Sequence, residues 1–300
     1  MTNVKPKLWT KDFIIISLTT FVVFLILNLL LTTLAVYAVE EFDASPSMAG
    51  LASGIFIIGE LLARLFTGRY LENVGRKRML FGGLVLFLLI MLLYFPVESM
   101  IALLIVRFFH GAAFGIAVTV LATAIVDTIP VARRGEGISY YSMNMTLAMG
   151  MGPFLGALLT IHANYDVMFV VCVILAFIGI IIALFARISE IAPPEPTVGP
   201  ETKMTAERTS IRRILSLKDF FEMKAVPISI VILVMTFSFS GVLTFLNSYA
   251  QEINLVYPAT FFFVVYAGSI IVSRLITGPL YDKKGENIVV FPSLLLYALG

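Results

Sequence analysis

Residues 68–78, GRYLENVGRKR, separate two long apolar runs of the chain. The stretch returns as GPLYDKKG at residues 278–285, and the match extends backwards, because RLFTG at 64–68 aligns with RLITG at 274–278. Both copies lie between apolar runs. A repeat of this kind at long range indicates a duplicated bundle of membrane helices. The alternative is a chance similarity between two basic loops.

Apolar segments recur along the whole chain. Hydrophobic residues make up 59% of its 300 residues and charged residues only 13%. Each segment is long enough to cross a hydrocarbon core of about 30 Å as a helix. They predict membrane spans at residues 13–38, 48–70, 79–96, 99–126, 137–161, 165–187, 225–250 and 257–281, with a ninth beginning near 287. The first span is too long for a cleavable signal peptide, and the single cysteine, Cys172, excludes a disulfide within the chain.

The charges predict the side of the membrane on which each loop lies. Lys5, Lys7 and Lys11 precede the first span, so we expect the N-terminus to be cytoplasmic. If the spans alternate from there, the outer loops contain acids but neither lysine nor arginine, and the inner loops contain most of the basic residues. The net charge of +2 thus hides an asymmetry across the membrane, and it does not suggest a nucleic-acid partner.

Three regions follow from this pattern. We expect an N-terminal six-helix bundle at 1–188, a linker at 189–223 and a second bundle at 224–300. The linker is rich in proline, and its apolar and basic residues beyond 210 predict a short amphipathic helix on the cytoplasmic membrane surface. Because the second bundle stops inside a span, we expect this chain to be a fragment that lacks about three helices of a matching second half.

The repeated loop resembles the signature loop of the major facilitator superfamily, with Glu72 in place of the usual aspartate. The resemblance implies an all-α membrane protein with the major facilitator fold: two six-helix bundles, the second one truncated in this chain. It also implies that the loops gate the conformational change, together with an acid at the end of the fourth span. The gating residues implied in this way are Gly68, Glu72, Gly75, Arg76, Asp127, Gly278, Asp282 and Gly285. Solvated loop charges without such a role are the alternative.

The fourth span contains RFFHGAAFG at residues 107–115, which resembles the R-x-x-x-G motif of the same family. Arg107, Gly111 and Gly115 fall on one helical stripe, so the glycines let a partner helix approach closely. An arginine about 12 Å deep needs a counter-charge or a wet cavity. The resemblance implies that Arg107 takes part in proton transfer, and a purely structural arginine is the alternative. For His110 we expect a packing role.

One carboxylate lies deep within the predicted spans. Glu60 shares a helical face with Arg64, four residues later, so the two side chains can pair. Burial of a carboxylate costs several kcal/mol unless it is paired or protonated. We expect Glu60 to carry the coupling proton and to reach Arg107, which lies at a similar estimated depth. The alternative is a structural ion pair with Arg64.

The fifth span contains GPFLG at residues 152–156. Gly152, Pro153 and Gly156 resemble the G-P-x-x-G motif of the antiporter branch of the superfamily. Ala148, Ser139 and Ala157 depart from the longer pattern, which leaves the direction of transport open. Small residues at this spacing also allow tight helix packing without any further role.

Four polar residues in the spans are candidate cavity residues, because a polar group at membrane depth faces protein or water and not lipid. They are Asn28, Tyr140, Asn144 and Asn247. For Asn28, a hydrogen bond within the helix packing is the alternative.

The motifs together favour a secondary active transporter that exports a small organic compound by proton antiport, as in multidrug efflux, with alternating access. A proton symporter or facilitator that imports a small metabolite is the alternative. An enzyme is not expected, since no nucleophile–base set or phosphate-binding loop occurs, and a receptor would not need the duplicated bundle. We expect neither cofactor nor metal. The expected partners are the small-molecule substrate, protons and the lipid bilayer, and we expect a monomer in the cell membrane.

Overall fold

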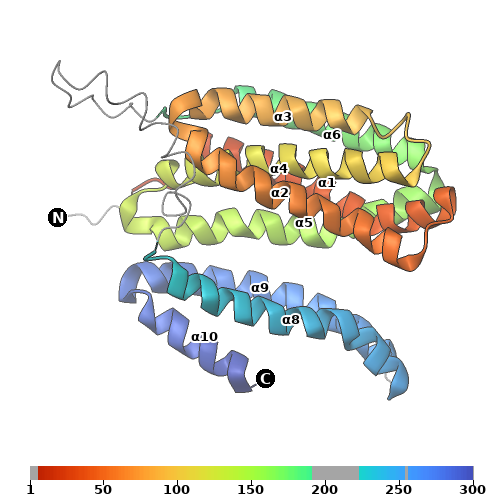
Figure 1. Cartoon of the computed structure of the whole chain (residues 1–300). Helices are drawn as coiled ribbons and strands as arrows, with labels where there is room; N and C mark the ends of the chain where they lie inside the picture. The colour runs from red at the N-terminus through yellow and green to blue at the C-terminus, as the bar shows by residue number, and fades with distance from the viewer. Residues whose placement is uncertain (1–5, 191–222, 254–255, 300) are drawn as a thin grey trace. The chain divides into compact units, whose positions relative to one another are not determined.

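The computed structural model describes residues 6–190, 223–253 and 256–299, and every regular element among them is helical. Figure 1 shows long helices joined by short turns. Their bounds are α1 Lys11–Phe42, α2 Pro46–Val74, α3 Arg76–Leu92, α4 Met100–Thr128, the 3-10 turn η1 Val131–Arg133, α5 Arg134–His162, α6 Tyr165–Leu184, α8 Val226–Glu252, α9 Val256–Lys284 and α10 Asn287–Leu299. Each predicted span overlaps one of these helices. The predicted amphipathic helix of the linker lies outside the described residues.

Four of the described helices are long and apolar enough to cross a membrane: Lys11–Phe42, Pro46–Leu71, Met100–Thr128 and Tyr165–Leu184. α3 has only 17 residues, which is at the short limit for a spanning helix of about 20. Large apolar side chains stand exposed on several helices, among them Ile101 on α4 and Phe154 on α5. Outward apolar side chains of this kind are typical of helices that face lipid.

Side-chain caps explain where several helices begin. The hydroxyl of Ser45 accepts a hydrogen bond from the backbone N–H of Met48, and Pro46 occupies the first turn of α2. Ser99 caps α4 in the same way, with the N–H of Ala102 as donor. Such caps satisfy N–H groups that the first helical turn leaves without an intrahelical partner.

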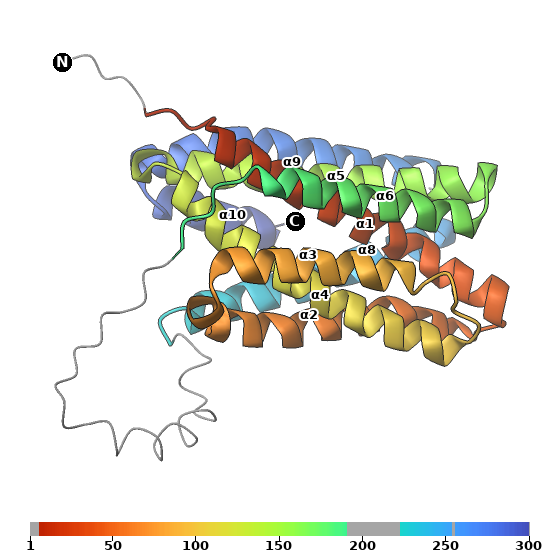
Figure 2. The ribbon, with the colours of Figure 1, turned by 90° about the horizontal axis from the view of Figure 1, so that it is seen from above.

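Among the first six helices, α1, α2 and α3 make the same kinds of contacts as α4, α5 and α6. α1 packs on α5 and α6, and α4 packs on α2 and α3 (Figure 2). α1 also contacts α4, and α3 contacts α6. Exchanging α1, α2 and α3 for α4, α5 and α6 therefore leaves the set of contacts unchanged. This is the arrangement expected of an internal structural repeat.

Glycines set the distance between α2 and α4. A Cβ atom on Gly111 would lie 2.0 Å from the carbonyl oxygen of Phe56, and one on Gly115 would lie 2.6 Å from that of Glu60. No side chain fits at either place without moving a backbone. The partner helix that approaches the glycines of the fourth span is therefore α2.

The second close crossing joins α5 to α1. A Cβ atom on Gly152 would lie 2.6 Å from that of Asn28, and one on Gly156 would lie 2.7 Å from the Thr33 methyl group. Pro153 lies inside the same helix, where it removes one backbone donor. The two crossings are equivalent in the packing pattern, but only the one with α4 contains a buried arginine.

The chain divides into two compact units. The first comprises Met1–Ile191 and Ser269–Gly300, and the second comprises Ala192–Gly268. The first unit thus contains α1 to α6, the later part of α9 and α10, while the second contains α8 and the earlier part of α9. Both copies of the repeated loop lie in the first unit. The region boundaries at 188 and 223 stay predictions.

Candidate functional site

The two repeated loops have the same backbone turn. Gly75 has a φ of 92° and Gly285 a φ of 82°, a conformation that residues with a side chain rarely adopt. The N–H of Gly75 donates to the carbonyl oxygen of Leu71 at 3.1 Å, and the N–H of Gly285 donates to that of Tyr281 at 2.9 Å. These residues occupy equal positions in the two copies. The repeat in the sequence is therefore also a repeat in the structure.

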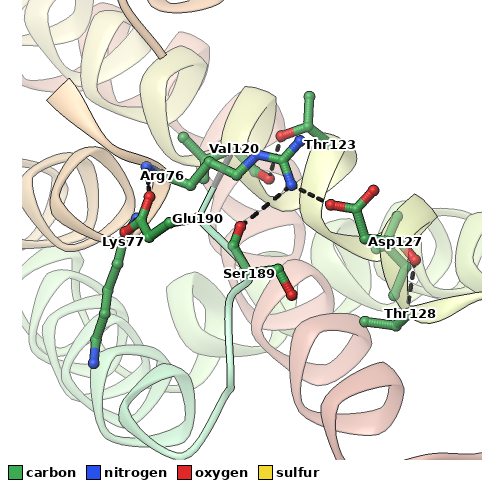
Figure 3. Close-up of polar contacts among 9 residues, drawn as sticks. Arg76, Lys77, Val120, Thr123, Asp127, Thr128, Ser189 and Glu190 are labelled. Carbon is green, nitrogen blue, oxygen red and sulfur yellow. Dashed lines mark hydrogen bonds and ion pairs between the residues drawn. The ribbon is translucent and has the colours of Figure 1, made fainter. Parts of the chain in front are cut away.

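The first loop binds the end of α4. The guanidinium of Arg76 forms an ion pair with Asp127, and its Nη1 also donates to the carbonyl oxygen of Ser189 at 3.4 Å. Figure 3 shows Arg76 extended between these two acceptors. Arg76 and Asp127, two of the expected gating residues, are thus in contact. The side chain of Glu72, the expected acid of the same loop, lies outside the described part of the chain.

A residue that the sequence did not single out completes the first loop. The Glu190 carboxylate accepts hydrogen bonds from the backbone N–H groups of Arg76, at 2.7 Å, and Lys77, at 3.1 Å. α3 begins directly after Gly75 without a side-chain cap of its own, so Glu190 supplies the missing acceptor (Figure 3). The only signal in the sequence is an acid just after the sixth span.

The second loop binds the beginning of α5. The Asp282 carboxylate accepts hydrogen bonds from the backbone N–H groups of Gly135, at 2.6 Å, and Glu136, at 2.8 Å. Gly278, one turn earlier, lies against the same helix, because a Cβ atom there would be 2.5 Å from the Ser139 hydroxyl oxygen. Charge-assisted bonds to the first turn of a helix are among the stronger hydrogen bonds in proteins.

Gly68 is the counterpart of Gly278 in the first loop, and it differs. A Cβ atom on Gly68 would meet nothing within 4 Å among the described residues. The two equivalent glycines therefore have unequal surroundings, although their loops turn in the same way.

Arg107 lies fully buried between α4 and α2. Its Nε donates to the carbonyl oxygen of Ala52 at 3.1 Å, and its guanidinium lies 4.5 Å from the ring centre of Phe56. Nη1 and Nη2 are buried and have no hydrogen-bond partner in the described part of the chain. The guanidinium also interacts with the side chain of Tyr94. A buried guanidinium whose donors are not all bonded costs free energy unless a further partner or water reaches it.

His110 lies one turn further along α4, also fully buried. Its Nδ1 is 3.1 Å from the hydroxyl oxygen of Tyr94, and its ring lies 4.3 Å from that of Phe87 between ring centres. Its Nε2 has no partner among the residues described. Sequence reasoning did not single out Tyr94, because it lies beyond the end of α3 and belongs to no motif.

Glu60 does not bind Arg107 in this structure, contrary to the sequence-based expectation. Its Oε1 lies 2.5 Å from Nη2 of Arg64 on the same helix. Arg107 reaches Ala52 instead, which is eight residues before Glu60 and so about 12 Å away along α2. The Glu60 side chain is 17% exposed and that of Arg64 43% exposed, so this ion pair is partly accessible.

The candidate cavity residues have different surroundings. Asn28 is buried at the crossing with Gly152, and its Nδ2 donates to the carbonyl oxygen of Phe24 in its own helix at 2.8 Å. This position fits the packing alternative. Tyr140 is half-buried against Trp9, with ring centres 5.0 Å apart. Asn144 is half-buried, and the side chain of Asn247 lies outside the described part.

No cluster of three or more metal-ligating side chains occurs within the described ranges. The expectation that the protein binds no metal and no cofactor stays a prediction.

Comparison with known proteins gives one family over nearly the whole chain. The sequence profile of the Major Facilitator Superfamily matches residues 16–300. An uncharacterised MFS-type transporter of Methanocaldococcus jannaschii is 25% identical over 292 residues, which cover 97% of this chain and 73% of the relative. The multidrug resistance protein MdtL of Escherichia coli is 23% identical over 208 residues, which cover 69% of this chain and 49% of the relative. MdtL of Shigella dysenteriae matches to the same extent.

Proposed function

Because the chain belongs to the Major Facilitator Superfamily and is a membrane transporter of that family, we propose that it exports a small organic compound in exchange for protons. Transport would proceed by alternating access between two states of the bundle. The name of the relative MdtL supports a drug-like substrate, although the matched region spans only about half of that protein.

The observation that carries the proposal is the buried, incompletely bonded guanidinium of Arg107. A guanidinium in this position needs a counter-charge or water in at least one state of a transport cycle. A carboxylate that approaches it ionises more readily, and one that leaves it ionises less readily. Movement of Arg107 relative to an acid would therefore convert a conformational change into uptake or release of a proton.

Glu60 is the acid that we propose for this exchange. It lies on α2, against which Arg107 packs, and its present partner Arg64 is partly exposed. A change in the Arg107 rotamer would bring the guanidinium towards the carboxylate without moving the glycines out of the crossing with α2. In the state observed here Glu60 pairs with Arg64 and Arg107 binds the backbone of Ala52.

We further propose that the signature loops gate the exchange between states. Asp282 and Gly278 would hold α9 against α5 in one state and release it in the other. Arg76 and Asp127 would keep the first loop on α4 during this movement, and Gly75 and Gly285 would preserve the turns. The contacts that support this proposal are the hydrogen bonds of Asp282 and the ion pair of Arg76.

The proposed direction of transport and the proposed cavity residues depend on α5 and α8. Gly152, Pro153 and Gly156 support an antiporter through their resemblance to the G-P-x-x-G motif, and the two glycines lie on the face of α5 that packs against α1. Tyr140 and Asn144 remain the proposed cavity residues of α5, with Asn247 on α8. Asn28 is better explained by helix packing. We place the protein as a monomer in the cell membrane with a cytoplasmic N-terminus.

The test is proton movement in vesicles that contain the full-length protein. A pH-sensitive dye reports the internal pH after a proton gradient is imposed, and a panel of organic cations and neutral compounds is then added. A substrate of a proton antiporter dissipates the gradient, and Glu60→Gln abolishes this response while exchange of labelled substrate without a gradient persists. Proton and substrate movement in the same direction would support the importing symporter instead.

A further inference from the structure

A pocket lies where the second signature loop meets α5. Its volume is about 360 Å³, within the range of small-molecule sites of about 300 to 1,000 Å³. α5 contributes Arg134, Ile138 and Ser139, and α9 contributes Thr277 and Tyr281. Val289 of α10 closes one side. All of these residues belong to the first compact unit.

The lining of the pocket fits an anion with an apolar part. Arg134 is the charged residue of the lining, and its side chain is exposed and forms no ion pair with the described residues. The neighbouring acids already have partners: Asp282 binds the first turn of α5, and Glu136 pairs with Arg133 at 2.7 Å. Gly135 and Gly278 also line the pocket, and the Asp282 carboxylate adjoins it through its bond to the Gly135 N–H. Because that carboxylate is bonded to the backbone, Arg134 is the charged side chain of the lining that remains for a ligand.

The other lining groups complement the charge of Arg134. Ser139, Thr277 and Tyr281 each carry a hydroxyl group that can donate to an oxygen anion. Ile138 and Val289 give an apolar wall. One arginine with several hydroxyl donors is a typical environment for a phosphate group, because guanidinium and phosphate match in geometry and charge.

We propose that this pocket binds a phosphate-bearing ligand and that Arg134 is its counter-charge. Since the lining comes from α5, α9 and α10, the pocket is complete only while Asp282 holds α9 on α5. A ligand that binds this arrangement and not the separated one shifts the population towards it. The site would therefore regulate the gate, which goes beyond the proposed exchange of substrate for protons, and binding can be measured without transport.

The first experiment compares two probes that share the phosphate chemistry. Purified protein in phosphatidylcholine nanodiscs, with and without phosphatidylglycerol, tests a lipid source, and sn-glycerol 3-phosphate added in detergent tests a soluble source. We expect Arg134→Gln to weaken binding of the active probe about tenfold, the effect of losing one charge-assisted hydrogen bond. Binding of phosphatidylglycerol alone assigns the site to a lipid headgroup, and binding of sn-glycerol 3-phosphate alone assigns it to soluble phosphates. Binding of both probes shows that the site recognises the phosphate group from either source.

A matched control separates this effect from general surface charge. Arg187 is also an exposed arginine, it follows α6, and the bond that it makes to Asp12 comes from its backbone N–H and not from its side chain. Arg187→Gln removes the same charge outside the pocket and should leave binding of both probes unchanged. Equal weakening by Arg134→Gln and Arg187→Gln would overturn the proposal in favour of non-specific attraction.

A second readout reports occupancy directly. Val289→Cys places a thiol in the pocket wall, while the native Cys172 is buried and should not react. We expect the active probe to slow alkylation of this thiol at least about threefold, and to lose this protection in the Arg134→Gln background. Alkylation at the same rate with and without either probe would show that the pocket binds no phosphate ligand.

Discussion

The two copies of the signature loop share a backbone turn and differ in the partners of their charged residues. In each copy a glycine with positive φ ends the turn, Gly75 in the first and Gly285 in the second. In the first copy the basic residue Arg76 pairs with Asp127 of α4. In the second copy the acidic residue Asp282 binds the first turn of α5.

These contacts come from non-equivalent positions of the motif, because Asp282 corresponds to Glu72, whose side chain lies outside the described part of the chain, and Arg76 corresponds to Glu286. The feature that the described residues of both copies share is therefore the turn. The turn depends on one local hydrogen bond from each glycine to the residue four positions earlier. The contacts depend on which helix lies beside the loop. Asp282 joins α9 to α5, whereas Arg76 and Asp127 stay within the first six helices. Under the proposed gating, the second loop is therefore the one whose contact breaks when α9 leaves α5.

The largest expected effect is at Asp282. Asp282→Ala removes both charge-assisted hydrogen bonds to α5, and each such bond contributes about 1.5 to 3 kcal/mol. We expect transport in the dye assay to fall at least about tenfold, while substrate binding in detergent changes little. Lys283→Gln changes the next residue, which is exposed, and serves as the control. Normal transport by Asp282→Ala would remove the second loop from the gating mechanism.

A matched pair of glycine substitutions compares the two loops directly. Gly278→Ala places a methyl group 2.5 Å from the Ser139 hydroxyl oxygen, whereas Gly68→Ala meets open space among the described residues. We expect Gly278→Ala to reduce transport about fivefold and Gly68→Ala to reduce it less than twofold, since only the first creates a steric conflict. An equal loss from both substitutions would show that the first loop also has a closely packed partner.

The positive φ that the loops share should make both glycines sensitive to substitution. Gly75→Ala and Gly285→Ala each force a side chain into a positive φ, at a cost of about 1 to 2 kcal/mol. We expect a lower unfolding midpoint in detergent for both variants, and at least as large a decrease for Gly75→Ala, because its Cβ would also lie 3.2 Å from the Glu190 carboxylate whereas that of Gly285 meets nothing within 4 Å among the described residues. Asparagine should not recover the loss at Gly75, because the ψ of 138° there lies outside the left-handed helical region that asparagine tolerates. A larger decrease for Gly285→Ala than for Gly75→Ala would contradict this account.

The Glu190 carboxylate binds the first loop. Its replacement should therefore lower stability through the first loop. Glu190→Gln weakens the two bonds to the backbone of α3, and we expect a loss of about 1 kcal/mol, as for other helix N-caps. Thermal unfolding should detect a midpoint about 2 °C lower. Glu286→Gln is the control, because that exposed glutamate uses only its backbone carbonyl as an acceptor. If the two variants have the same unfolding midpoint, the Glu190 cap does not contribute measurably to stability.

The smallest expected effect concerns the ion pair of the first loop. Asp127 is 45% exposed, so its pair with Arg76 contributes only about 0.5 kcal/mol. Asp127→Asn should lower transport about twofold, and the reversed pair Arg76→Asp with Asp127→Arg should restore part of it. Comparison of transport rates for the two single variants and the double variant gives the coupling between the residues. A loss as large as that of Asp282→Ala would place the gate at the first loop.

Local chemistry made the helices and the turns predictable. The predicted spans overlap the observed helices, because length and apolarity along the chain decide whether a segment can cross a membrane. The matching turns at Gly75 and Gly285 were predictable because the two copies of the motif align in the sequence. The close approach at Gly111 was also foreseeable, since glycines one helical turn apart leave room for a backbone, but the sequence did not identify α2 as the partner.

The partners of the charged residues depended on the tertiary structure. Estimated depth suggested that Glu60 and Arg107 meet, yet Arg107 binds the backbone of Ala52, and Glu60 binds Arg64. Depth is a single coordinate along a helix, whereas pairing also requires the rotation of each helix and the point where they cross. Glu190 shows the same limit, because it follows Arg76 by 114 residues and reaches it only since α6 packs beside α3.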